Sequence, residues 1–419
     1  MSVMIDEDAA SVPHQGLAGG FASGPPGGNP GDRSELLRRL MFTLGALIVY
    51  RIGCYLPMPG LDLAMVDKLR HISFFTGGES ISIFSLGIMP YISAFIVVQL
   101  ASRIFPQLGG STTGGAAART RLNQYARISA AVLATFQAVG TAVALKGVPG
   151  LVGAPTPIFE AMAVVTTVAG TAFLMWLAEQ ITANGIGDGA LLILACGIVS
   201  HLPFNLINAL NAVRTGEMEF AWVLSALLMA AAFLVAVAFM ECAKRRIPLY
   251  DPGYEIGQGG PPGSYRNVPL RINPAGVVPA LAAGIFVAPL LQSIATIGGL
   301  GAVAARYFSS GGFDLLYGAL IAMFAAYFNF AILDPDAAAT RPVESGGFLP
   351  GNGSGERTAH RTQSLHIAVA TVYVAAVCVL PLSIYRWTHL PSLLSGVQIF
   401  LLAWVMVRVL ERVRASWQS

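Results

Sequence analysis

Charged residues are scarce in this chain. Of its 419 residues only 11% are Asp, Glu, Lys or Arg, whereas 55% are hydrophobic, and the mean hydropathy is +0.65. Soluble domains carry roughly a quarter charged residues, so this shortage excludes an ordinary water-soluble enzyme and a disordered scaffold. The net charge of +3 is too small to indicate a nucleic-acid partner. The composition predicts a polytopic membrane protein.

Patterns typical of catalysis and metal binding are also missing from the sequence. It contains no Gly-x-Ser-x-Gly elbow, no His-Glu-x-x-His motif and no Walker loop. The four cysteines lie singly in apolar runs without a Cys-x-x-Cys spacing, and the six histidines form no evident cluster. We therefore expect no enzymatic activity, no cofactor and no metal site.

Long apolar runs, by contrast, are abundant. A bilayer core requires about 20 predominantly apolar residues per helical span. Residues 1–34 are rich in Gly and Pro, lack such a run, and are expected to be a disordered cytoplasmic tail. The expected spans, ten in all, are 38–56, 85–103, 127–147, 158–179, 186–209, 219–242, 275–298, 313–333, 364–385 and 390–410.

The distribution of Lys and Arg predicts the orientation. With the N-terminus inside, the cytoplasmic side holds 18 of these residues and the opposite side 6. By the positive-inside rule both termini are cytoplasmic. Two long polar loops, 243–272 and 334–363, then lie on the cytoplasmic side and indicate either a docking platform or plain linkers.

The expected spans contain almost no ionisable side chains, which argues against an ion-coupled carrier. Branched aliphatic residues can instead form a constriction that excludes water and ions. By spacing alone such residues can equally be ordinary helix packing. The candidates for a pore ring are Ile88, Ile92, Leu194, Ile198 and Leu281.

The sequence has a weak internal similarity: Gly87-Ile-Met-Pro90 at the second span resembles Gly276-Val-Val-Pro279 at the seventh. It indicates either inverted five-helix repeats or two unrelated kinks. The segment 73–84, before the second span, is too short and Gly-rich to cross the bilayer, so it is expected to be a re-entrant piece that could act as a stopper.

Several longer motifs resemble the SecY family, the channel subunits of the bacterial protein-conducting translocon. They are FTLGALIVYRIG at 42–53, GIMPYIS at 87–93, FLMWLAEQIT at 173–182 and SGGFLPG at 345–351. The resemblance implies an all-α membrane protein with ten helices in two inverted halves, 35–212 and 213–419, around a central hourglass pore.

The resemblance also implies roles for particular residues. The five aliphatic candidates correspond to the pore ring, and a tenth-span member is expected near Leu401. A lateral gate is expected between the second and third spans on one side and the seventh and eighth on the other. Implied partners are SecE-like and SecG-like small subunits, the SecA motor or the ribosome, secretory polypeptides and the lipid bilayer. The plug corresponds to Phe74, Phe75, Thr76, Gly77, Gly78, Glu79 and Ser80.

The chain departs from the family pattern at the docking loops. Gly353 stands where the family has an Arg that docks the ribosome and SecA, and Arg357 follows four residues later. Arg245 and Arg246 are retained, but the sequence after them has lost the basic tip. Loss of charge on a docking surface predicts weaker or different docking.

The leading hypothesis is a passive channel that moves unfolded secretory polypeptides across a bacterial cytoplasmic membrane and releases membrane segments laterally. The changed docking loops suggest an accessory copy beside a standard one. The alternatives are a secondary transporter of small solutes and a degenerate copy that binds partners without translocating.

Overall fold

The structure is a computed structural model that describes residues 33–62, 82–105, 116–147, 150–152, 157–250, 265–286, 313–333, 355–388 and 394–418. Residues 278–286 are helical in addition to the labelled elements. The labelled elements are α1 (Arg33–Tyr55), α3 (Met89–Ile104), α5 (Ala116–Lys146), α6 (Pro157–Asn184), α7 (Gly189–Arg214), α8 (Phe220–Cys242), β1 (Lys244–Tyr250), β2 (Tyr265–Arg271), α12 (Phe313–Leu333), α14 (Gly355–Thr388) and α15 (Gly396–Gln418).

Each of the ten expected spans coincides with a helix. The seventh is described only as far as residue 286, and the rest of the span expected there lies outside the described residues. Among the described residues, five helices (parts of α5 and α14, and the whole of α6, α7 and α8) are long and apolar enough to cross a membrane, and α3 and α12 contain shorter apolar stretches. The prediction of a helical, polytopic fold is confirmed.

The fifth span was the hardest to predict, because glycines and Pro203 interrupt its sequence. In the structure α7 begins at Gly189, the last of these glycines, and Pro203 lies inside the helix. Asp188 caps the helix, since its Oδ1 accepts hydrogen bonds from the backbone N–H groups of Ala190 (3.0 Å) and Leu191 (3.2 Å). Gly187 adopts a positive φ of 101° immediately before this cap. Gly185 and Gly187 therefore lie in the turn that precedes the helix, and Gly189 is its first residue.

The two long loops contain more regular structure than expected. Strands β1 and β2 pair antiparallel, with Lys244 opposite Arg271 and Tyr250 opposite Tyr265, so the loop at 243–272 includes a β-hairpin. The expectation that 334–363 is entirely loop was wrong for residues 355–363, which form the first turns of α14. The N-terminal tail was expected to extend to residue 34, but α1 already begins at Arg33.

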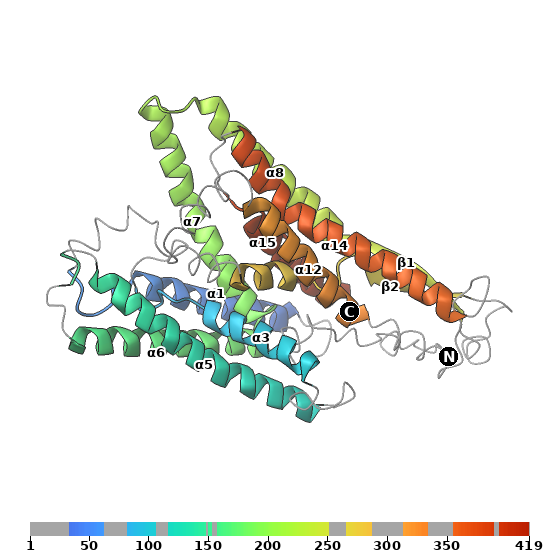
Figure 1. Cartoon of the computed structure of the whole chain (residues 1–419), viewed down its shortest axis with the longest axis horizontal. Helices are drawn as coiled ribbons and strands as arrows, with labels where there is room; N and C mark the ends of the chain where they lie inside the picture. The colour runs from blue at the N-terminus through green and yellow to red at the C-terminus, as the bar shows by residue number, and fades with distance from the viewer. Residues whose placement is uncertain are drawn as a thin grey trace, which may run out of the picture.

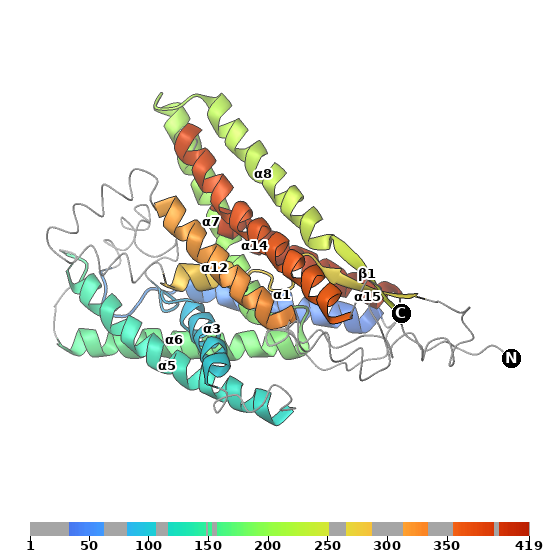
Figure 2. The same ribbon diagram turned by 45° about the vertical axis from the view of Figure 1, so that its right-hand side comes forward.

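The helices surround one main core (Figures 1 and 2). On one side α5 and α6 lie next to α3 and α1, and on the other α8 and α14 run beside α12 and α15. The largest fully buried side chains include Tyr50, Phe328 and Phe400, which come from α1, α12 and α15. The core thus joins early and late parts of the chain.

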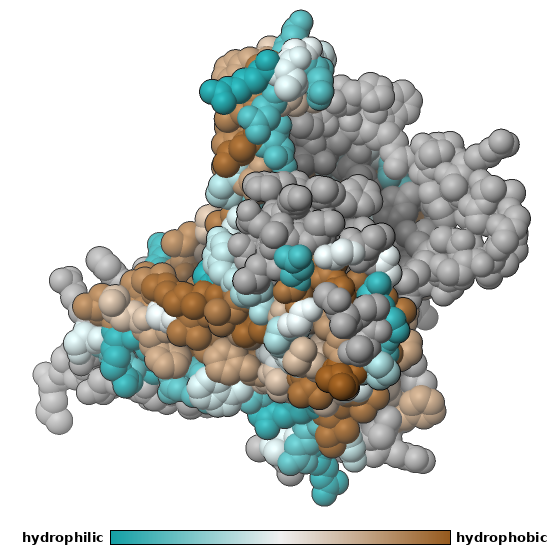
Figure 3. Space-filling model, turned by 90° about the vertical axis from the view of Figure 1, so that its left-hand side faces the viewer, coloured by the Kyte–Doolittle hydropathy of each residue, from teal (hydrophilic) through white to brown (hydrophobic). Residues whose placement is uncertain are grey.

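The exterior is apolar over wide areas (Figure 3). Phe136 on α5, Ile158 on α6 and Phe239 on α8 each leave about three quarters of their surface exposed. Soluble monomers rarely expose contiguous apolar patches of more than a few hundred Å². These faces suit contact with lipid tails.

Candidate pore constriction

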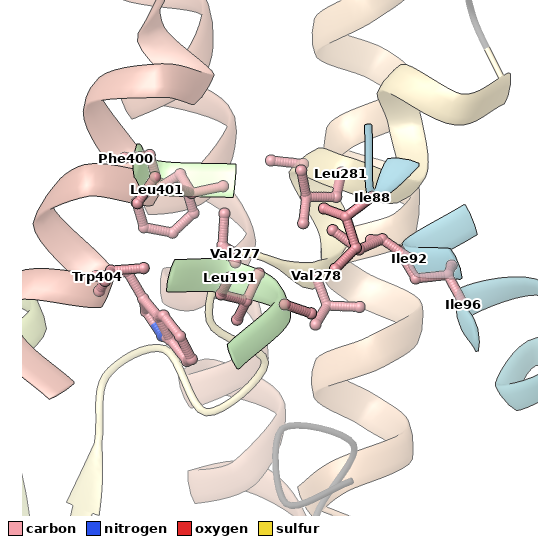
Figure 4. Packing of buried hydrophobic residues seen from close by; sticks show 14 of the residues in the cluster. Ile88, Ile92, Ile96, Leu191, Val277, Val278, Leu281, Phe400, Leu401 and Trp404 are labelled. Carbon is pink, nitrogen blue, oxygen red and sulfur yellow. The ribbon is translucent and has the colours of Figure 1, made fainter. Parts of the chain in front are cut away.

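The five residues expected to form a pore ring meet in the main core cluster. Ile88, the N-cap of α3, Ile92 on α3 and Leu281 on the 278–286 helix are buried in this cluster. Leu194 and Ile198 on α7 are half-buried and pack against the cluster. Figure 4 shows Ile88, Ile92 and Leu281 pointing toward one another. The fold therefore brings together residues that are almost 200 positions apart in the sequence.

The similar motifs at 87–90 and 276–279 form two turns with the same backbone conformation. Gly87 has φ 57° and Gly276 has φ 60°, values that favour glycine because a side chain would be strained there. In both cases the helix begins two residues later, and the proline occupies its second position. Proline is tolerated in a first turn because its missing N–H would have no helical partner. The two turns are structural counterparts, which two unrelated kinks would not be.

Backbone hydrogen bonds make the correspondence residue by residue. The Ile88 carbonyl accepts from the N–H groups three and four residues later, at 3.1 and 3.2 Å. The Val277 carbonyl accepts in the same way, at 3.1 Å from Ala280 and 3.2 Å from Leu281. Val277 is therefore the counterpart of Ile88, and Leu281 is the counterpart of Ile92.

Sequence reasoning missed several aliphatic residues of this cluster, among them Val277, Val278 and Leu191. Val277 is fully buried, and Val278 and Leu191 are buried beside it. Figure 4 places all three between α3 and α15. The similarity between the two motifs could have identified Val277, since it aligns Val277 with Ile88.

Helix α15, at the tenth expected span, also contributes side chains to the cluster. Leu401, expected near the ring, is buried on α15 beside Phe400. One turn further on, the indole of Trp404 lies against Gly276, where an added Cβ would come within 2.5 Å of the indole Nε1. The guanidinium of Arg408, four residues later on α15, lies over the Trp404 ring, 4.9 Å from its centre. Trp404 thus holds the turn that starts the seventh helix.

Polar contacts anchor the base of the β-hairpin next to this turn. Arg271, the last residue of β2, forms an ion pair with Glu411 of α15, and its carbonyl lies 2.7 Å from Nε2 of His366 on α14. Two residues later the Asn273 amide donates to Oε1 of Glu241 at the end of α8 (3.2 Å) and to the Gly276 carbonyl (3.1 Å). The end of β2 and the turn that follows it are therefore attached to α8, α14 and α15.

The other predicted site residues are only partly described. Arg245 and Arg246 lie on β1, and Arg357 lies in the first turn of α14. Gly353 and the plug residues 74–80 lie outside the described residues. In the part of the chain that the structure describes, no group of three His, Cys, Asp or Glu side chains could hold a metal ion.

Comparison with known proteins decides the family. The family model for SecY matches residues 82–410. The chain belongs to the SecY family. The protein translocase subunit SecY of Escherichia coli K12 is 34% identical over 93% of each chain. SecY of Buchnera aphidicola subsp. Acyrthosiphon kondoi is 37% identical over 77% of this chain and 96% of that relative.

Solved structures show the same fold at lower identity. A structure described as that of a protein conducting channel covers 94% of both chains with a TM-score of 0.64 and 17% identity. Sec61 in the canine ribosome-channel complex gives a TM-score of 0.62 at 16% identity. The chain therefore has the ten-helix channel fold with two inverted halves. It is a multi-pass membrane protein and the channel subunit of a protein translocase.

Proposed function

We propose that this SecY chain passes unfolded secretory polypeptides through the constriction formed by Ile88, Ile92, Leu194, Ile198 and Leu281. The observation that carries the proposal is the matched pair of turns at Gly87 and Gly276, each of which starts a helix that delivers aliphatic side chains to one cluster. We assign 35–212 and 213–419 as the two halves that contribute these turns.

An aliphatic constriction suits this task for a physical reason. Closely packed branched side chains leave no room for a continuous file of water, so ions do not cross. They also make no directional bonds that would select among side chains of a moving polypeptide. A channel of this kind can open for many sequences and close again.

We further propose that membrane segments leave sideways, between α3 and α5 on one side and the 278–286 helix and α12 on the other. The contact between α3 and the 278–286 helix in the cluster is made by Ile88, Ile92, Val278 and Leu281. Aliphatic contacts separate and re-form without leaving a polar group unsatisfied. The plug role of residues 74–80 remains a prediction from the sequence.

The proposed location is a bacterial cytoplasmic membrane, with both termini in the cytoplasm. The 18 to 6 distribution of Lys and Arg supports this orientation. Helices α1 and α15 both contact the turn before α7. Thr43, in the middle of α1, accepts from the Ile186 N–H at 2.9 Å, and Arg412, in the last third of α15, donates to the Gly187 carbonyl at 3.4 Å. The ion pair of Arg271 with Glu411 brings the hairpin to that same side.

The proposed partners are SecE-like and SecG-like small subunits and, on the cytoplasmic side, SecA or the ribosome. The hairpin strands carry Lys244, Arg245, Arg246, Arg266 and Arg271, so part of a basic docking surface is retained. Gly353 removes a charge from the other loop, and we propose that this altered platform belongs to an accessory copy.

Site-specific photocrosslinking tests the proposal. A photoreactive residue at Ile92 should crosslink to a stalled secretory chain in membranes that contain SecA, because position 92 is fully buried in the constriction. The same residue at Phe136, on the exposed face of α5, is the matched control and should not crosslink to that chain.

The outcome separates two possibilities. A crosslink at 92 alone identifies a working pore that tolerates the altered platform. No crosslink at 92, beside a clear one in a standard SecY, would refute translocation with these partners and favour the non-translocating alternative.

A further inference from the structure

Phe84, four residues before the constriction, is buried between α1 and α6. Only 5% of its surface is exposed. Its ring is nearly parallel to those of Tyr50 on α1, at 6.3 Å and 13°, and Phe173 on α6, at 5.8 Å and 7°. Three aromatic rings from distant parts of the sequence therefore stack in one column.

Two glycines make room for this ring. A Cβ on Gly53 of α1 would lie 1.9 Å from Cε2 of Phe84, and a Cβ on Gly170 of α6 would lie 2.2 Å from the Ile83 carbonyl oxygen. Real Cβ atoms do not approach other atoms so closely, so any side chain at either position must displace Phe84 or its backbone. We call the space between Gly53, Gly170, Tyr50 and Phe173 the Phe84 slot.

The backbone around Phe84 is held as firmly as its ring. The Ile83 N–H donates to the Leu56 carbonyl at the end of α1 (3.1 Å), and the Phe84 N–H donates to the Ser82 hydroxyl (3.2 Å). The Phe84 carbonyl accepts from the Gly87 N–H (2.8 Å), which closes the turn that starts α3. Ile88 is the next residue. A fixed Phe84 therefore fixes where Ile88 and Ile92 point.

We propose that Phe84 is a positioning residue for the channel constriction: the Phe84 slot attaches the first half of the ring to α1 and α6. This inference rests on the proposed function of the constriction. The counterpart of Phe84 in the second half is Asn273, which is held by hydrogen bonds to Glu241 and Gly276. The two halves of the ring are thus attached by different chemistry, apolar stacking in one and polar contacts in the other.

The experiment measures resting ion leak through the purified SecY chain, reconstituted into liposomes with a SecE-like subunit. We expect Phe84→Ala to raise the leak by about tenfold, because the free energy lost with a buried ring exceeds that needed for a tenfold shift in a two-state population. Phe159→Ala is the matched control. Phe159 is about equally buried, but it packs with Met58 and Ala163 in a cluster separate from the one that contains the constriction. This variant should leave the leak unchanged.

A rescue pair keeps the test decisive if Phe84→Ala folds poorly. Gly53→Ala should raise the leak, because its Cβ collides with Cε2, Cδ2 and Cζ of Phe84. Leucine lacks atoms equivalent to Cε2 and Cζ, so Gly53→Ala combined with Phe84→Leu should return the leak toward the unmodified level. If the double variant leaks at least as much as Gly53→Ala alone, the proposed role of the Phe84 slot is refuted.

A third variant, Ile92→Gly, separates the slot from the constriction. If Ile92→Gly leaks and Phe84→Ala leaks no more than Phe159→Ala, the positioning role is wrong while the constriction stands. If Ile92→Gly does not leak either, the proposed constriction is wrong, and the role of Phe84 falls with it.

Discussion

The turn at Gly276 provides a quantitative test of how the seventh helix is held. Gly276→Ala places a Cβ in a left-handed backbone conformation (φ 60°), which costs about 1–2 kcal/mol. The same Cβ would lie 2.5 Å from Nε1 of Trp404. The indole is 6% exposed and stacked against Arg408, so it cannot move without disturbing its neighbours. Overpacking of this kind adds about 1–3 kcal/mol, for a total of about 2–5 kcal/mol.

Gly216, in the turn between α7 and α8, is the matched control. Its φ is 77°, but an added Cβ would meet no atom within 4 Å. Gly216→Ala should therefore cost only the backbone strain, about 1–2 kcal/mol. The difference between the two variants isolates the contact with Trp404.

Thermal unfolding in detergent, followed with a thiol-reactive dye, measures both variants. Cys54 and Cys378 are buried and become reactive when the helices separate. We expect the midpoint to fall clearly further for Gly276→Ala than for Gly216→Ala. Equal midpoints would refute the idea that Trp404 holds this turn.

Two further predictions concern polar anchors on the same side of the protein. Arg271→Gln and Glu411→Gln should each lower the free energy of unfolding by about 1 kcal/mol, and the double variant should cost less than the sum of the two. Strict additivity would show that this partly buried ion pair contributes nothing to stability. Asp188→Ala should cost about 1 kcal/mol through loss of the α7 cap, whereas Asp188→Asn should keep most of the stability. Equal loss in both Asp188 variants would contradict the capping role.

Much of the fold could be predicted from local sequence. The ten expected spans coincide with helices, the seventh as far as it is described, because a bilayer demands long apolar runs wherever a helix crosses it. The start of α7 was harder, since Gly185, Gly187 and Gly189 could either interrupt a helix or precede one. The Asp188 cap resolves this ambiguity, and its hydrogen bonds are visible only in the structure. The first turns of α14 were missed because polar residues 355–363 carry no apolar signal.

The candidate site was predicted in part. Ile88, Ile92 and Leu281 were found through their motifs, and the structure brings them together. Val277 was missed because its role depends on a backbone turn that matches the one at Gly87. The Phe84 slot could not be found from sequence, since it joins Gly53, Phe84 and Gly170 from three segments that only the folded chain makes adjacent.

Hydrophobicity and the order of motifs can be read over short stretches, so the sequence is enough to predict a ten-helix membrane protein of the SecY family. How the aliphatic side chains meet, and what keeps them in place, depends on the tertiary structure. Close contacts such as Gly53 with Phe84 and Gly276 with Trp404 depend on the relative placement of distant helices. That placement follows from packing of the whole core, which no local pattern specifies.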